Sequence, residues 1–114
     1  MTNKTIFSAQ TTNGSSTTFK AVGDLNGSAN KDVIGDLNGA IKIYSFLTIY
    51  GTFAGATLTL KYKAADGNWY PTGDVSITDS CSYFIEISPN VEYRLDLAGA
   101  TGTTSISSTV YNVV

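Results

Sequence analysis

Histidine is absent from the 114-residue sequence, and charged residues make up only 14% of it. Without an imidazole the chain has no serine–histidine pair, no zinc–histidine site and no histidine general base. Ordinary globular proteins carry about a quarter charged residues, so the polar surface here must come from Thr, Ser, Asn and Gly. The formal net charge of -2 offers no basic stripe for phosphates, and we expect no binding to nucleic acid.

Cysteine and long apolar runs are also scarce. The single Cys81 cannot form a disulfide within the chain, and its setting between two serines predicts a small buried or half-buried side chain. No stretch approaches the ~20 apolar residues of a membrane span, and Met1-Thr2-Asn3-Lys4 does not begin a secretory signal. We therefore expect no membrane partner and a protein made in a cytoplasm.

Alternation of apolar and polar residues with a period of two recurs after residue 40. It is clear in GATLTLKYK (55–63), SYFIEI (82–87) and VEYRLDLA (91–98), where one face of each strand is apolar. Asp66-Gly67 is a strong turn signal and predicts a hairpin that joins 55–64 to 68–72. Short strands separated by frequent turns predict an all-β protein with a single antiparallel β-sandwich, jelly-roll or immunoglobulin-like.

The first 40 residues have a different character. They contain a polar stretch, AQTTNGSSTTF (9–19), and a doubled GDLNG that begins at Gly23 and again at Gly35. We expect residues 1–40 to form an extended N-terminal arm with turn-rich loops, and residues 41–114 to form the β-sandwich. Within the arm, Ile6 with Phe7 and Phe19 with Val22 are candidates to anchor short strands.

The first GDLNG copy places side-chain oxygens at alternate positions, as loops around calcium do. Its weak candidate ligands are Asp24, Asn26, Ser28 and Asp32. The spacing resembles the D-x-N-x-D-x-x-x-D loops of integrin-type propeller repeats, but Ser28 stands where a carboxylate is expected. The second copy has no oxygen at the fifth place. We expect two type I or Asx-type turns closed by Gly27 and Gly39, with no metal and no cofactor.

Two other sets of residues are candidates for chemistry. Glu86, Glu92 and Asp96 are carboxylates of the kind that a glycosidase pairs, but they alternate with core residues and more simply keep the sheet soluble. Trp69 and Tyr70 follow the Asp-Gly turn, and such rings either stack on a sugar or pack in a core or subunit contact. No set of acid, base and nucleophile can be assembled, so we expect no enzyme.

The segment IKIYSFLTIY (41–50) is apolar on both faces. Leu47 and Ile49 share one face, while Tyr44, Phe46 and Tyr50 occupy the other. A strand of this kind is either covered on both sides or has one face that meets another chain. Because one small domain has few residues to spare for a second cover, we predict Tyr44, Phe46 and Tyr50 to form an oligomer interface.

Residues 50–110 resemble a small β-sandwich module that is common among virion proteins of tailed bacteriophages. The matching motifs are Gly51-Thr52-Phe53 with Gly55-Ala56-Thr57, Asp66-Gly67 with Trp69, Tyr93-Arg94-Leu95, and Gly99-Ala100-Thr101-Gly102. They cover about half of the chain, and the first 40 residues match no module.

The resemblance implies a structural virion protein. Such a protein would be a capsid decoration or cement protein at the capsid surface, where it bridges and stabilises major capsid protein subunits. It would also contact itself, as a homotrimer or another homo-oligomer. The alternative is a carbohydrate- or receptor-binding β-sandwich module of a phage fibre or tail, with Trp69 and Tyr70 as its ligand platform.

Overall fold

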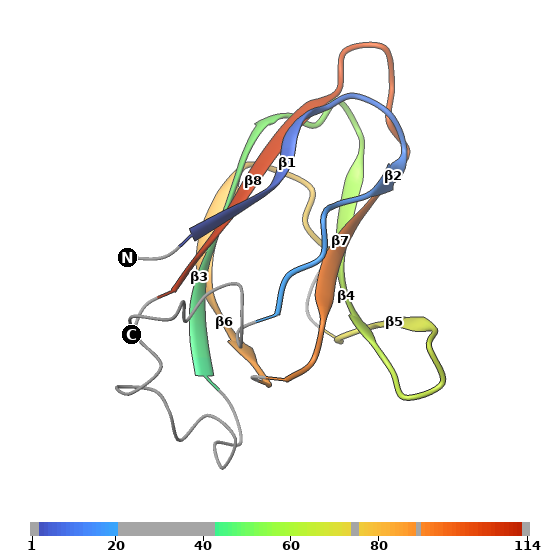
Figure 1. The fold of residues 1–114 in the computed structure, drawn as a ribbon. Coiled ribbons are helices and arrows are strands. Elements are labelled where there is room, and N and C mark those ends of the chain that lie inside the picture. The colour runs from blue at the N-terminus through green and yellow to red at the C-terminus, as the bar shows by residue number, and fades with distance from the viewer. Residues whose placement is uncertain (1–2, 21–42, 74–75, 89, 113–114) are drawn as a thin grey trace.

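The computed structural model describes residues 3–20, 43–73, 76–88 and 90–112 (Figure 1). Within these ranges the chain forms eight β-strands and no helix. The strands are β1 (Asn3–Gln10), β2 (Gly14–Ser15), β3 (Ile43–Thr52), β4 (Thr57–Lys63), β5 (Trp69–Pro71), β6 (Cys81–Ile87), β7 (Tyr93–Ala98) and β8 (Ser105–Asn112). The same ranges contain no helix long and apolar enough to span a membrane.

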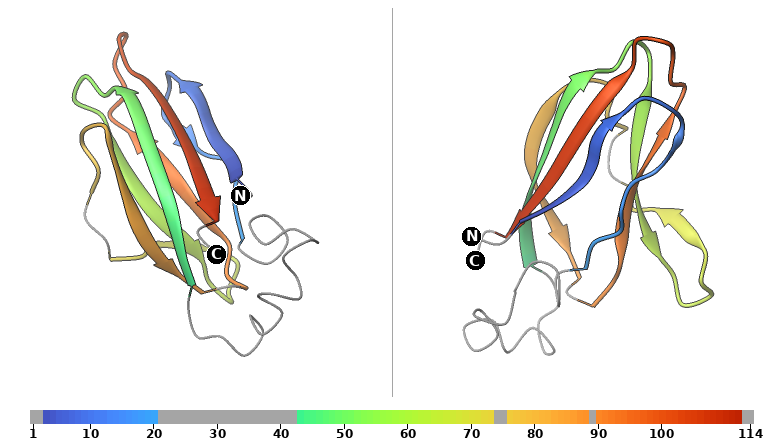
Figure 2. Two further views of the ribbon diagram at one scale, coloured as in Figure 1. Left: turned by 90° about the vertical axis from the view of Figure 1, so that its left-hand side faces the viewer. Right: turned by 45° about the horizontal axis from the view of Figure 1, so that its top comes forward.

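The strands form two packed antiparallel sheets, with the orders β1-β8-β3-β6 and β2-β7-β4-β5 (Figures 1 and 2). Four of the pairings join β1 to β8, β2 to β7, β3 to β6 and β4 to β5. The chain therefore resembles one long hairpin, with β4 and β5 at its tip, that is rolled into two layers. This is the arrangement of a jelly roll, so the predicted all-β antiparallel sandwich is confirmed.

The core lies between the two sheets and is built from alternate positions of the strands. Leu47 and Ile49 on β3 point inward and are 0% and 2% exposed, as the alternation predicts. The inward residues of β4, β6, β7 and β8 meet them and are also buried: Leu58, Leu60, Ile85, Ile87, Leu95, Leu97, Ile106 and Val110. Each such side chain contributes about 1.5–3 kcal/mol when it is removed from water.

The predicted hairpin between 55–64 and 68–72 is confirmed. β4 and β5 pair with Lys61 opposite Pro71 and Lys63 opposite Trp69. At the turn, the Asn68 N–H donates to the Asp66 carboxylate at 2.8 Å, and Gly67 adopts a φ of +85°. The middle residue of this Asx turn adopts a left-handed backbone conformation, which glycine does readily. This explains why Asp-Gly marks the position of the turn.

The domain boundary predicted at residue 40 is wrong for residues 3–20, which belong to the sandwich. β1 pairs with β8, and a register shift between Thr5 and Phe7 brings both Ile6 and Phe7 into the core. Phe19 is fully buried and forms an isolated bridge with Tyr93 on the other sheet. Ile6 with Phe7 and Phe19 therefore act as the anchors that the sequence indicated. Residues 21–40 of the predicted arm, with Val22, lie outside the described residues.

The prediction for Cys81 is also wrong, because this residue is exposed. Cys81 is the first residue of β6, which is the last strand of its sheet and has a neighbour on one side only. Partial burial of the thiol, assisted by the Asp79 carboxylate, raises the pKa of Cys81. A raised pKa disfavours the reactive thiolate at neutral pH.

Candidate functional site

One face of the molecule carries a group of aromatic side chains, which we call the outer aromatic surface: Phe46, Tyr50, Phe84 and Tyr111. It lies on the outer side of the β1-β8-β3-β6 sheet, since these residues alternate with inward residues of β3, β6 and β8. Phe46 stands opposite Phe84 on β6 and opposite Tyr111 on β8. The ring centroids of Phe46 and Phe84 are 5.1 Å apart, and those of Phe46 and Tyr111 are 6.3 Å apart.

The outer aromatic surface is open to solvent. Phe84 is 63% exposed and Tyr50 is 57% exposed, whereas Phe46 and Tyr111 are half-buried by their neighbours. Single exposed apolar side chains are normal, but a contiguous row across three strands is typical of an interaction site. Among the described outward positions of β3, β6 and β8, Glu86 is the one charged residue. Depletion of charge around exposed aromatic rings matches the centre of a protein interface.

The structure places two of the three predicted interface residues, Phe46 and Tyr50, on this surface. The side chain of Tyr44, the third, lies outside the described part of the chain. Sequence reasoning missed Phe84 and Tyr111. That these two side chains point outward could have been predicted, because Phe84 directly precedes the inward Ile85 and Tyr111 directly follows the inward Val110. The pairing that brings them beside Phe46 depends on the sheet register, which no local pattern reveals.

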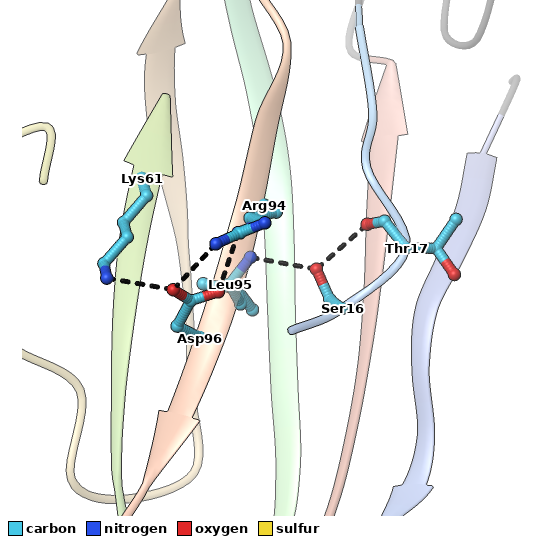
Figure 3. Close-up of polar contacts among 6 residues, drawn as sticks. All are labelled: Ser16, Thr17, Lys61, Arg94, Leu95 and Asp96. Carbon is cyan, nitrogen blue, oxygen red and sulfur yellow. Dashed lines mark hydrogen bonds and ion pairs between the residues drawn. The ribbon is translucent and has the colours of Figure 1, made fainter. Parts of the chain in front are cut away.

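The outer face of the other sheet is polar and is held by ion pairs (Figure 3). The Lys61 ammonium on β4 lies 2.9 Å from the Oδ2 of Asp96 on β7. Arg94 Nε lies 2.9 Å from Asp96 Oδ1, and Arg94 Nη2 donates to Oδ2 at 3.4 Å. The Nε and Oδ1 atoms are buried and not aligned for a hydrogen bond, so that contact is electrostatic only.

Trp69 and Tyr70 do not share a face. The Arg94 guanidinium lies 4.3 Å from the centroid of the Trp69 ring, on the polar outer face. Tyr70, the next residue along β5, points to the opposite side and packs against Tyr62, with centroids 6.2 Å apart. Its hydroxyl donates to Asp66 at 2.7 Å, and this bond, assisted by the Asn68 N–H, lowers the pKa of Asp66. The two rings therefore do not form one flat platform.

The three carboxylates considered for catalysis are spread over the molecule. Glu86 lies on the outer side of one sheet and Asp96 on the outer side of the other. Glu92 precedes Asp96 by four residues, which separates them by about 13 Å along an extended chain. The calcium candidates Asp24, Asn26, Ser28 and Asp32 lie outside the described residues. Within the described ranges, no three His, Cys, Asp or Glu side chains come together in a way that could hold a metal ion.

No protein-family model, curated protein or solved structure matches this chain.

Asp96 should make the stability of the protein depend on pH. Burial raises its pKa, but hydrogen bonds from Lys61 and Ser15 and the charge of Arg94 outweigh burial, so the pKa is lowered from 3.8. A carboxylate with a lowered folded pKa contributes stability above its unfolded pKa and loses it as the pH falls through the folded value. Asp96→Asn should therefore cost about 1 kcal/mol at pH 7, or about 4 °C in Tm.

The difference in Tm between wild type and Asp96→Asn should narrow as the pH falls below about 4, and it should close once the carboxyl is neutral in both the folded and the unfolded state. Calorimetric melts from pH 7 to pH 2 measure this. Lys63→Gln is the matched control, since Lys63 is exposed on β4, the strand that carries Lys61, and its replacement should cost less than about 0.5 kcal/mol. A difference that stays constant over this pH range would rule out the stabilising role of the ionised Asp96.

Proposed function

We propose that this chain is a structural subunit of a virus particle, a capsid decoration or cement protein that bridges and stabilises major capsid protein subunits. The observation that carries the proposal is the outer aromatic surface. Phe84, Phe46 and Tyr111 form an uncharged row across three neighbouring strands, and Tyr50 lies four residues beyond Phe46 on β3. Exposed rings of this kind gain about 25 cal/mol for each Å² that a neighbouring subunit covers.

Two further features support an assembly role. Jelly rolls are frequent among viral capsid and lectin domains, and the motifs within 50–110 resemble a virion module. The fold alone does not select a function, since one architecture hosts many. The placement of the aromatic rings does favour assembly, because aromatic side chains near the centre of an interface supply a large share of its binding energy.

The alternative, a carbohydrate- or receptor-binding module of a fibre or tail, depends on Trp69 and Tyr70. A sugar ring that stacks on Trp69 must share the outer face with the Arg94 guanidinium, while Tyr70 points to the other side of β5. This arrangement offers a sugar one partly covered ring in place of a platform of two. It therefore favours the assembly role over the sugar-binding role.

Sedimentation with assembled heads of the virus that carries this sequence tests the proposal. The 114-residue chain should be larger than a monomer by light scattering at tens of micromolar, and it should pellet with the heads. The double variant Tyr50→Ser/Phe84→Ser should bind the heads at least about tenfold more weakly, since two exposed anchors are lost. Tyr70→Ser, which removes an exposed ring from the other sheet, is the control and should bind as wild type does.

A chain that remains monomeric and does not pellet with heads would contradict the proposal. Binding to a glycan array that disappears with Trp69→Ala, in a protein that remains folded, would support the carbohydrate-binding alternative.

A further inference from the structure

Among the described residues, the sandwich has one long edge strand that carries none of the usual protecting features, and this edge indicates how a second copy of the chain can dock. We propose that two copies pair through the free edge of β6, antiparallel and centred on Phe84. The two four-stranded β1-β8-β3-β6 sheets then join into one continuous sheet of eight strands. The inference rests on the proposed assembly role, because it specifies the contact that the protein makes with itself.

The four edges of the two sheets differ in how they are protected. β1 contains two register shifts, β2 is two residues long, and β5 is three residues long and ends at Pro71. Bulges, short strands and prolines are the devices by which proteins keep sheet edges from pairing with other chains. β6 has none of them. It is seven residues long, contains no proline and pairs with β3 without a register shift.

β6 is the outermost strand of its sheet, and no described strand pairs with its other side (Figure 2). On this side the backbone of β6 forms no ladder with a described strand, so a second antiparallel ladder can be added there. Addition of a strand at an exposed edge gives main-chain hydrogen bonds to whichever segment docks. Specificity for one particular segment must therefore come from the side chains.

The sequence of β6 is self-complementary about its middle residue. Phe84 is the fourth of the seven residues, so a two-fold axis through it places Phe84 opposite Phe84 of the second copy. The same register places Ser82 opposite Glu86 of the second copy, so no like charges face each other. A shift by two residues in one direction would instead bring the two Glu86 side chains closer to each other and separate the two phenylalanines.

This register also continues the outer aromatic surface from one copy to the other. Phe84 is the most exposed large apolar side chain of the described chain, at 63%, and it lies at the end of the row that contains Tyr111 and Phe46. Across the two-fold axis the row would double in length, with the two Phe84 rings in contact at its centre. Cross-strand aromatic pairs of this type stabilise sheets. A strand from an unrelated protein would provide the backbone bonds but not the matching ring.

Cysteine cross-linking tests the pairing and its register. In a Cys81→Ser background, Ser82→Cys and Glu86→Cys are prepared as two separate proteins, since both positions are exposed. In the proposed register the two residues are directly opposite, with Cβ atoms about 5 Å apart, and mild oxidation of the mixture should give a disulfide-linked dimer. Each protein alone should cross-link at least about tenfold less, because identical positions are then about 13 Å apart.

The second test introduces a charge at the two-fold axis and measures self-association. Phe84→Lys places two ammonium groups opposite each other and should weaken self-association at least about tenfold by analytical ultracentrifugation. Tyr70→Lys is the matched control. Tyr70 is also an exposed aromatic residue, but it lies on β5 of the other sheet, and its replacement should change self-association less than about threefold.

The outcomes separate this inference from the proposed function. Dimers that do not cross-link through positions 82 and 86, or that dissociate equally with Tyr70→Lys and Phe84→Lys, would overturn the β6 pairing. The proposed function would survive that result if the chain still binds heads. A chain that is monomeric at tens of micromolar would overturn the β6 pairing, and binding to heads would then decide the proposed function by itself.

Discussion

Replacing Gly51 by alanine should remove about 4 kcal/mol or more of folding free energy, which is most of the stability of an ordinary small domain. A Cβ atom on Gly51 would lie 2.0 Å from the Ser105 carbonyl oxygen and 3.0 Å from its carbon. Both are backbone atoms, so no side chain can move aside. Gly51 also has a φ of +134°, a conformation that side chains rarely adopt.

The clash would lie between two paired strands in the interior of a sheet. Gly51 pairs with Ile106 in the ladder between β3 and β8, and β8 is an interior strand of its sheet. To admit a methyl group, β3 or β8 must shift, and the fully buried Ile106 would shift with it. Close packing transmits such a displacement to the neighbouring core residues.

Urea denaturation of purified variants measures the effect, with Gly55→Ala and Gly67→Ala as controls. Both control glycines have a positive φ, +90° and +85°, but an added Cβ atom at either one meets nothing within 4 Å. Each should cost about 1–2 kcal/mol for the left-handed backbone alone. If Gly51→Ala costs no more than these controls, the close approach of β3 to Ser105 is not a feature of the protein.

Much of the sandwich could be predicted because alternation in a strand is a local property. The inward faces of β4 and β7 are the ones that the sequence pattern indicated, from Leu58 and Leu60 to Leu95 and Leu97. Ser45 shows how strong the pattern is. It lies in phase with Leu47 and is fully buried, although its hydroxyl has no hydrogen-bond partner in the described structure.

The N-terminal strand was hidden because bulges break alternation. Ile6 and Phe7 are adjacent in sequence and both are buried, and Ala9 adopts a φ of +50°. Neither feature fits a period of two, so the polar residues around them suggested an arm. A similar limit applies to the outer aromatic surface. Phe46 and Tyr50 could be identified on their own strand, but Phe84 joins them only through a register fixed by the whole sheet.

The two outer faces also differ in a way that composition alone could not reveal. One face uses its few charges in a network of Lys61, Arg94 and Asp96, whose hydrogen bonds and ion pairs need no partner molecule. The other face carries aromatic rings with little charge nearby. Since exposed aromatic area is stabilised only when something covers it, this asymmetry is the reason why we assign the proposed assembly contacts to the β1-β8-β3-β6 sheet.

Replacing Phe19 by alanine should cost about 3–5 kcal/mol, because the side chain is 0% exposed and truncation leaves a cavity between the sheets. Phe19 packs against Tyr93 with ring centroids 5.8 Å apart, and two backbone hydrogen bonds of 2.9 and 2.8 Å join the same two residues. These bonds fix the residue 14–20 segment along the edge of β7. Loss of the ring should therefore loosen this segment together with the core.

Thr17→Ala is the matched control, because Thr17 lies two residues away in the same segment with an exposed side chain. It should change the free energy of unfolding by less than about 0.5 kcal/mol, measured by urea denaturation beside Phe19→Ala. Equal stability of the two variants would mean that residues 3–20 form an arm outside the core. If Phe19→Ala loses much more free energy of unfolding than Thr17→Ala does, the N-terminal segment unfolds cooperatively with the rest of the sandwich. This follows because only a buried ring leaves a cavity when it is removed.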